Sequence, residues 1–161
     1  MNKIRVLSVD PGLRITGFSI LDVIKNKPQL LAYGTIKPKP KDTLPQRLNY
    51  LFEETNKILD QFLPDTMAIE DAFYSNNVKS AMVLGQARGS IILSAAQAEI
   101  SVHEFAPRKV KMSVCGNGAA SKEQVSYMVT QILKLKEAPK PLDVSDAMAV
   151  GLCYINQNKF L

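Results

Sequence analysis

Three short apolar segments follow one another at the start of this chain, and they limit the possible folds more than any other feature. Residues 3–9, 14–23 and 29–36 each have the composition of a strand. The connections between them are short and contain a Pro-Gly pair and an Asn-Lys-Pro triplet, residue types that reverse the chain. Parallel strands need a crossover of about a dozen residues or more, so these three strands are predicted to form an antiparallel meander.

After the meander, helices and strands alternate. Thr43 with Gln46, and Ser121 with Gln124, have the spacing of a capping box at a helix start. Three consecutive strands followed by alternation predict an α/β fold with a five-stranded mixed sheet flanked by helices. At 161 residues the chain is most simply one domain, residues 1–161. The later elements are expected to be a helix from Thr43 or Leu44 to Pro64, a strand over 66–69, a helix over 78–98, a strand over 101–105, and helices over 107–115, from 121, and over about 143–155.

Composition and charge limit the function. Hydrophobic residues make up 46% and charged residues 22% of the chain, which is typical of a globular domain. No run has the length of a signal peptide or a membrane span, so we expect a cytoplasmic protein without membrane contact. The net charge of +5 favours a polyanionic partner. Cys115 and Cys153 match no zinc spacing and are expected to be buried free thiols, and His103 is expected to be structural.

Four carboxylates stand where a metal-dependent nuclease needs them. Asp10 and Glu70 each follow a short apolar run, as if held at a strand end. Asp143 and Asp146 are three residues apart at the start of an apolar stretch, so one helical face would carry both. Such a set suggests a cage for hard divalent cations, with Asp10 bridging two of them. Two ions could activate the attacking water and stabilise the leaving oxygen in phosphodiester hydrolysis.

Each carboxylate also has a structural interpretation. Asp10 before Pro-Gly could be a turn residue, Asp143 a helix N-cap, and Asp146 a residue that stabilises the positive end of the helix dipole. Taken singly, these interpretations are favoured for Asp10 and Asp143. Glu70 is harder to explain in this way, because a charged residue directly after Met-Ala-Ile is expected to be partly buried.

Basic and aromatic residues near these carboxylates could contact nucleic acid. Arg108, Lys109 and Lys111 cluster before a Gly-Asn-Gly loop, and Lys122 follows that loop. They could bind phosphates, although such a cluster is most often a solvated helix face. Phe73 lies in a polar stretch, where it could stack on an unpaired base or anchor local packing.

Small residues recur in the helix predicted over residues 78–98. Ala81, Gly85 and Gly89 fall at four-residue intervals. Glycine inside a helix costs about 1 kcal/mol relative to alanine, and the close approach of another backbone would offset that cost. The other backbone could belong to the sheet of the same chain or to a second copy, and the spacing alone favours neither.

Four motifs occur in order over nearly the whole chain: Asp10-Pro11-Gly12-x-x-x-Thr16-Gly17-Phe18, Ala68-Ile69-Glu70-x-x-Phe73, Leu84-Gly85-Gln86-Ala87-Arg88-Gly89 and Asp143-x-x-Asp146-Ala147. Through these motifs the chain resembles the RuvC-type Holliday-junction resolvases. The resemblance implies a ribonuclease H-like fold and a homodimer. It also implies that the dimer resolves four-way (Holliday) DNA junctions by paired, symmetric, metal-dependent phosphodiester hydrolysis during homologous recombination and DNA repair.

The resemblance also implies roles for these residues. The four carboxylates would be the catalytic metal-binding residues, with two Mg²⁺ ions per active site and Mn²⁺ able to substitute. Lys111 and Lys122 match basic residues that support DNA binding and catalysis, and Phe73 matches an aromatic residue that engages bases at the junction centre. The small-residue helix falls where the family dimerises, which favours a dimer interface. A branch-migration helicase complex would be a further partner.

Three alternatives remain at this point. One is another enzyme of the same fold, such as a ribonuclease H acting on RNA–DNA hybrids or a resolvase-like RNA-processing enzyme, because metal ligands do not specify the substrate. An actin-like ATPase or sugar kinase would need a second, similar half, and the chain has no internal repeat. A catalytically inactive junction-binding module is the third, although all four carboxylates are present.

Overall fold

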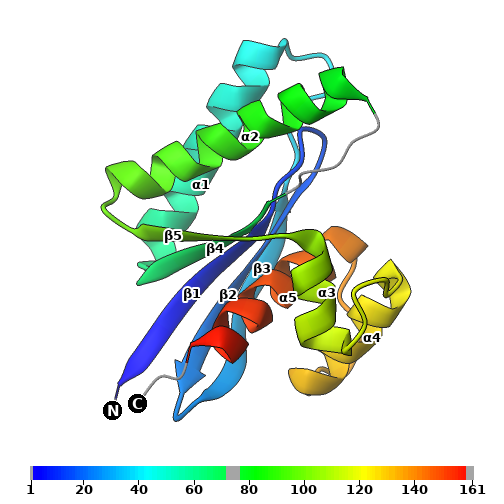
Figure 1. Ribbon diagram of the computed structural model, residues 1–161. Coiled ribbons are helices and arrows are strands. Elements are labelled where there is room, and N and C mark those ends of the chain that lie inside the picture. The colour runs from blue at the N-terminus through cyan, green and yellow to red at the C-terminus, as the bar shows by residue number, and fades with distance from the viewer. Residues whose placement is uncertain (1, 72–76, 159–161) are drawn as a thin grey trace.

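The computed structural model describes residues 2–71 and 77–158, and a five-stranded sheet lies between two groups of helices (Figure 1). The order of the strands in the sheet is β3-β2-β1-β4-β5. The pairs β1–β2 and β2–β3 are antiparallel, whereas β1–β4 and β4–β5 are parallel. The predicted meander and the predicted mixed sheet are therefore confirmed. The strands are β1 (Lys3–Asp10), β2 (Thr16–Ile24), β3 (Lys27–Ile36), β4 (Thr66–Glu70) and β5 (Ser101–Phe105).

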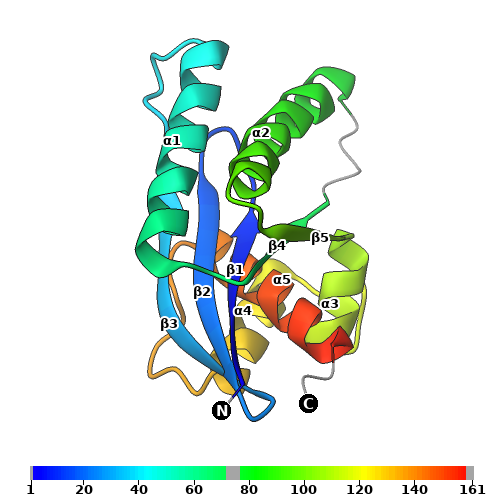
Figure 2. The ribbon, with the colours of Figure 1, turned by 90° about the vertical axis from the view of Figure 1, so that its left-hand side faces the viewer.

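Helices cover both faces of the sheet, and each face has its own apolar core. Val6 packs into the core beneath α3, α4 and α5, whereas its neighbour Leu7 packs into the core beneath α1 and α2. This follows from the alternation of side chains along a strand. Figure 2 shows α1 and α2 together on one side of the sheet and α3, α4 and α5 on the other. The helices are α1 (Leu44–Phe62), α2 (Val78–Gln97), α3 (Pro107–Cys115), α4 (Lys122–Ile132) and α5 (Leu142–Gln157).

The local predictions at chain reversals and helix starts are mostly confirmed. Both predicted capping boxes are present, at the starts of α1 and α4. The turn between β2 and β3 differs from the prediction: Lys25 and Asn26 form it with positive φ angles of 51° and 61°. Pro28 already lies in β3, where an edge strand tolerates the missing N–H.

Helix α5 packs closely against the central strands because a glycine lies on each side of the contact, Gly151 in α5 and Gly17 in β2. A Cβ on Gly151 would lie 2.7 Å from Leu21 Cδ1 and 2.8 Å from Ser8 Oγ. A Cβ on Gly17 would lie only 2.1 Å from the carbonyl oxygen of Asp143. Gly17 is also the β2 partner of Asp10. The Thr-Gly pair of the first motif therefore allows the start of α5 to lie beside the end of β1.

The described residues also bear on three smaller predictions, which concern membrane spans, the two cysteine thiols and His103. Over 2–71 and 77–158, no helix combines the length and apolar character needed to cross a membrane. Both cysteines are free thiols; Cys153 is buried as predicted, but Cys115 is only half-buried. His103 lies on the edge strand β5 with its ring 4.9 Å from the ring of Tyr154, a packing contact that fits a structural role.

Candidate active site

Three of the four predicted carboxylates line one small pocket. Asp10 is the last residue of β1 and Glu70 is the last residue of β4. Because β1 and β4 are parallel neighbours, their carboxyl ends meet at the same edge of the sheet. Asp146, from the first turns of α5, reaches the same pocket, whose volume is about 150 Å³. The interpretation of Asp10 as a simple turn residue is wrong, because Asp10 is paired with Gly17 within the sheet.

The pocket brings together carboxyl groups that are half-buried. Burial raises the pKa of Asp10 to about 9, and the neighbouring carboxylates add to that shift. Burial also raises the pKa of Glu70, although a hydrogen bond from Asp10 opposes the shift. These directions describe a pair in which Asp10 keeps its proton and donates it to Glu70. Desolvation and like charges both disfavour ionisation, so the metal-free pocket holds fewer charges than its carboxylates would carry in water.

Asp143 lies beside this pocket rather than in its lining. Its negative charge acts on Asp10, Asp146 and Lys122, so it is close to two of the other carboxylates and to one of the lysines. Its side chain, however, lines a neighbouring hollow together with Gly12. The N-cap interpretation of Asp143 is wrong: the N-cap of α5 is Pro141, and Asp143 is the second residue of the helix. Asp143 therefore stands at the border between two concave surfaces.

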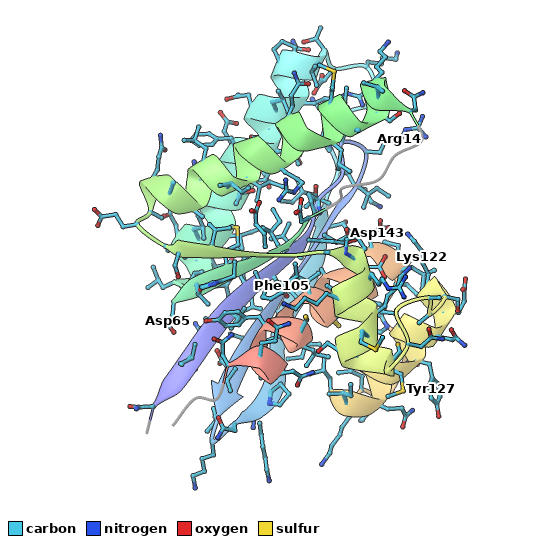
Figure 3. All side chains as sticks on the ribbon, in the orientation of Figure 1. Arg14, Asp65, Phe105, Lys122, Tyr127 and Asp143 are labelled. Atoms are coloured by element: carbon cyan, nitrogen blue, oxygen red, sulfur yellow. The ribbon has the colours of Figure 1, made fainter. Side chains whose placement is uncertain are left out.

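Two lysines complete the pocket wall. Lys111 from α3 and Lys122 from the start of α4 both line it. Lys122 Nζ lies 3.4 Å from Asp146 Oδ2. Burial lowers the pKa of Lys122, but the Asp146 carboxylate outweighs this effect and raises it overall. Figure 3 shows Asp143 and Lys122 at the neighbouring N-terminal ends of α5 and α4.

The other predicted DNA-contacting residues lie elsewhere or outside the described residues. Arg108 is exposed and its side chain lies against Gly118. Lys109 Nζ lies over the Phe105 ring, 5.9 Å from the ring centroid. Neither lines the carboxylate pocket. Phe73 falls in the segment 72–76, outside the described residues, so its role stays a prediction.

The residues present fit a hydrated divalent cation. Within residues 2–71 and 77–158, no three acidic, histidine or cysteine side chains are grouped closely enough to enclose an ion unaided. Magnesium does not need such a cage, because it keeps several waters and is bound by one or two carboxylates together with substrate phosphates. The observation that fits a cation is the set of oxygen donors: Asp10 and Glu70 are half-buried at one pocket, and no ion pair involves either of them within the described part of the chain.

Arg88 is a functional candidate whose role the sequence did not reveal. Its Nε donates to the backbone carbonyl of Glu70 at 3.0 Å, and its Nη1 lies 3.5 Å from Asp71 Oδ1. It also forms an ion pair with Glu104 of β5. The side chain is only 15% exposed. Arg88 therefore ties α2 to the ends of β4 and β5, next to the carboxylate of Glu70. The only sequence signal was its place in a quoted motif, which gave no direction for the side chain.

Two of the three small residues in α2, Gly85 and Gly89, face away from the other described elements. A Cβ on Gly85 or Gly89 would meet nothing within 4 Å, so packing against the sheet of the same chain is wrong for both glycines. Ala81 is half-buried. Two large apolar side chains on the same helix, Val78 and Met82, are 75% and 64% exposed. This face of α2 is therefore apolar, and none of the residues described in the structure covers it.

The chain is similar to known proteins over nearly its whole length. Residues 6–154 match the family model described as crossover junction endodeoxyribonuclease RuvC. The RuvC protein of Finegoldia magna is 47% identical over 156 residues, which cover 97% of this chain and 95% of that protein. The RuvC protein of Dictyoglomus thermophilum is 43% identical over 150 residues, covering 93% and 95%.

Solved structures agree with the sequence relatives. The structure of Thermus thermophilus RuvC in complex with a Holliday junction substrate superposes with a TM-score of 0.86 at 32% identity, covering 93% of this chain and 92% of that one. The yeast mitochondrial Holliday junction resolvase matches with a TM-score of 0.66 at 11% identity, covering 95% and 79%. This second likeness shows a common fold. The likeness to the Thermus RuvC structure confirms the expected fold class, an α/β ribonuclease H-like fold with a five-stranded mixed sheet.

Proposed function

Because this chain belongs to the RuvC family of crossover junction endodeoxyribonucleases, we propose that Asp10, Glu70, Asp143 and Asp146 form its catalytic metal site. As a member of that family the chain is a metal-dependent nuclease that acts on Holliday junctions in DNA recombination and repair. The observation that carries the assignment of the site is the pocket in which three of these carboxylates meet, and in which burial and the neighbouring carboxylates raise the pKa of Asp10. A divalent cation would relieve that repulsion.

The proposed cofactor is Mg²⁺, two ions per site, with Mn²⁺ able to substitute. Such ions supply an activated water and stabilise the leaving oxygen of a phosphodiester. The chain contributes the placement of its oxygens: the sheet fixes Asp10 and Glu70, and the close contact at Gly17 fixes the start of α5. Magnesium suits this arrangement because it takes only a few carboxylates and completes its shell with water and phosphate.

The lysines on the pocket wall suit the binding of a phosphate next to these ions. Lys111 and Lys122 face the carboxylates from α3 and α4, which lie on one side of the pocket. Lys122 offsets part of the charge of Asp146 while no cation is present. Phosphate contacts of this kind hold a DNA backbone in register without reading its sequence. Arg108, Lys109 and Phe73 remain predicted DNA contacts.

We further propose a homodimer formed through α2. The uncovered face around Gly85 and Gly89 would let two helices approach closely, with Val78 and Met82 covered by the partner. Two sites related by a two-fold axis suit a junction whose opposite strands are equivalent. The curated relatives and the complex of the Thermus protein favour a junction over an RNA–DNA hybrid as substrate. Contact with a branch-migration helicase complex stays a prediction.

A direct test is cleavage of a synthetic four-way junction with each arm end-labelled in turn. The expected result is paired nicks at symmetry-related positions, with Mg²⁺ or Mn²⁺ and not with EDTA. A plain duplex and an RNA–DNA hybrid of the same sequence serve as controls. Equal cleavage of the hybrid, or nicking that does not depend on the junction, would contradict the assignment.

A further inference from the structure

A second concave surface lies directly beside the carboxylate pocket. It has a volume of about 520 Å³ and is bounded by the β1–β2 connection, the start of α1 and the start of α2. Asp143 belongs to its lining and is the only acidic residue among those that line it. The hollow therefore adjoins the proposed metal site, to which Asp143 belongs.

Three cations surround this hollow. They are Arg14, Arg47 and Lys79, from three separate elements. Arg14 and Lys79 are exposed, and no ion pair involves either of them within residues 2–71 and 77–158. Figure 3 shows Arg14 near the start of α2, beyond Asp143 as seen from Lys122. Arg47 is held in place, because its Nε donates to the carbonyl of Asp42 at 3.0 Å and its Nη2 to that of Pro40.

The floor of the hollow is apolar. Leu13 and Ile15 contribute from the β1–β2 connection, and Val83 and Leu84 contribute from α2. A surface that combines aliphatic side chains with unpaired cations suits a ligand with an apolar body and an anionic edge. A DNA strand presents such a ligand as deoxyribose and phosphate. A free inorganic anion would contact the cations but not the aliphatic side chains of the hollow.

We propose that this hollow is a binding site for the DNA backbone, on the side of Asp143 opposite Lys111 and Lys122. The proposal rests on the proposed function, because it takes the cleaved strand to pass Asp143. Lys111 and Lys122 contact the strand on one side of the scissile phosphate. Arg14 and Lys79 then contact phosphates of the same strand on the other side. Cations on both sides hold the strand across the carboxylates and fix which phosphate is cut.

The test compares two double variants that each remove two positive charges. Arg14→Ala with Lys79→Ala alters the hollow, whereas Lys27→Ala with Lys136→Ala alters exposed lysines that line neither concave surface. Arg47 is left intact because its loss would free two backbone carbonyls. The dissociation constant of a four-way junction is measured without divalent ions over a salt series.

The hollow variant is expected to bind about tenfold more weakly at 0.1 M salt. Its slope of log affinity against log salt should be smaller by about two, since each phosphate contact contributes about 0.9. The control variant should keep the slope of the unmodified protein to within about half a unit. Equal slopes for the two double variants would overturn the proposal.

A second measurement locates the contact. Junctions carrying one neutral methylphosphonate at successive positions around the cut are bound by the unmodified protein and by the hollow variant. At positions on one side of the cut, neutralising a phosphate should weaken junction binding by the unmodified protein several-fold. The same change should leave junction binding by the hollow variant unaffected. Equal weakening of both proteins at every position would overturn the proposal. If the unmodified protein cleaves no junction while the slopes still differ, the proposed function fails and the anion site stands.

Discussion

Two aspartates on adjacent strands of this sheet, the half-buried Asp10 and the buried Asp22, have opposite electrostatic environments. Asp22 on β2 is 6% exposed and is surrounded by cations: Arg5 Nε lies 2.8 Å from its Oδ1 and Lys3 Nζ lies 2.8 Å from its Oδ2. Asp10 on β1 is surrounded by other carboxylates. Burial alone would raise the pKa of Asp22, but the bonds to Arg5 and Lys3 lower it overall. Burial raises the pKa of Asp10, and its neighbours raise it further.

The difference separates a carboxylate that stabilises the fold from carboxylates that suit a metal ion. A charge buried without a partner is destabilising, so a folded protein normally pairs it, as this chain does at Asp22. At the end of β1, Asp10 forms no such ion pair with any described residue and keeps its proton instead, because burial and the neighbouring carboxylates raise its pKa. A divalent cation at the proposed metal site would take the place of that proton.

The largest expected effect is the loss of cleavage when a pocket carboxylate becomes an amide. Asp10→Asn and Asp146→Asn should each reduce junction cleavage by about 1000-fold or more, because an amide is a poor ligand for Mg²⁺. Junction affinity without divalent ions should change little. Cleavage rates and dissociation constants measured on one junction give both numbers. Full cleavage by either variant in Mg²⁺ would contradict the role of the pocket.

Asp22→Asn should have the opposite profile. It leaves Arg5 without its main partner and is expected to lower the free energy of unfolding by about 2 kcal/mol, while cleavage per folded molecule stays unchanged. Urea unfolding followed by circular dichroism measures the first effect, and the junction assay measures the second. A loss of cleavage without a loss of stability would remove the distinction between the two aspartates.

Substitution of Arg88 tests whether residues outside the pocket lining affect cleavage and its dependence on Mg²⁺. Arg88→Met keeps the length of the side chain but removes the bond to the Glu70 carbonyl, and it should reduce cleavage about tenfold at limiting Mg²⁺. Glu104→Gln removes only the neighbouring ion pair and serves as the matched control. A rise in the Mg²⁺ concentration needed for half-maximal cleavage should accompany the first change alone. Identical Mg²⁺ curves for the two variants would show that the bond to Glu70 has no effect on the site.

The pH dependence of stability should also differ between the two aspartates. Because the pKa of Asp10 is raised from 3.8 to about 9, its contribution to stability is complete below about pH 4 and is lost as the pH rises toward 9. Because the pKa of Asp22 is lowered, its contribution is present above about pH 4 and is lost below it. In EDTA, unfolding free energies of the unmodified protein should therefore fall between pH 5 and 9, and Asp10→Asn should flatten that decline. A decline of the same steepness in both proteins would exclude Asp10 as its source.

Sequence patterns predicted the features that depend on neighbouring residues. The capping boxes at Thr43 and Ser121 and the strand ends at Asp10 and Glu70 follow from local spacing and apolar runs, and the structure has all four. The interpretation of Asp143 as an N-cap was wrong, because the sequence did not show that the helix begins at Leu142.

Features that need the tertiary fold were beyond local patterns. The hydrogen bond from Arg88 to the backbone carbonyl of Glu70 joins residues that are 18 positions apart, one on a helix and the other on a strand. The hollow gathers Arg14, Arg47 and Lys79 from three elements that no spacing rule connects. The outward direction of Gly85 and Gly89 depends on which face of α2 meets the sheet. In each case the sequence shows the residue type, but only the folded chain shows which other residues lie beside it.

The central claim is that the repulsion among the pocket carboxylates is relieved by a divalent cation. Titration calorimetry of Mn²⁺ into the protein at pH 7, in two buffers of different ionisation enthalpy, tests it most directly. A proton held by Asp10 must leave when a metal binds, so binding should be accompanied by proton release in the unmodified protein. Asp10→Asn should bind weakly and release no proton. Absence of Mn²⁺ binding, or tight binding with the same apparent enthalpy in both buffers, would contradict the account.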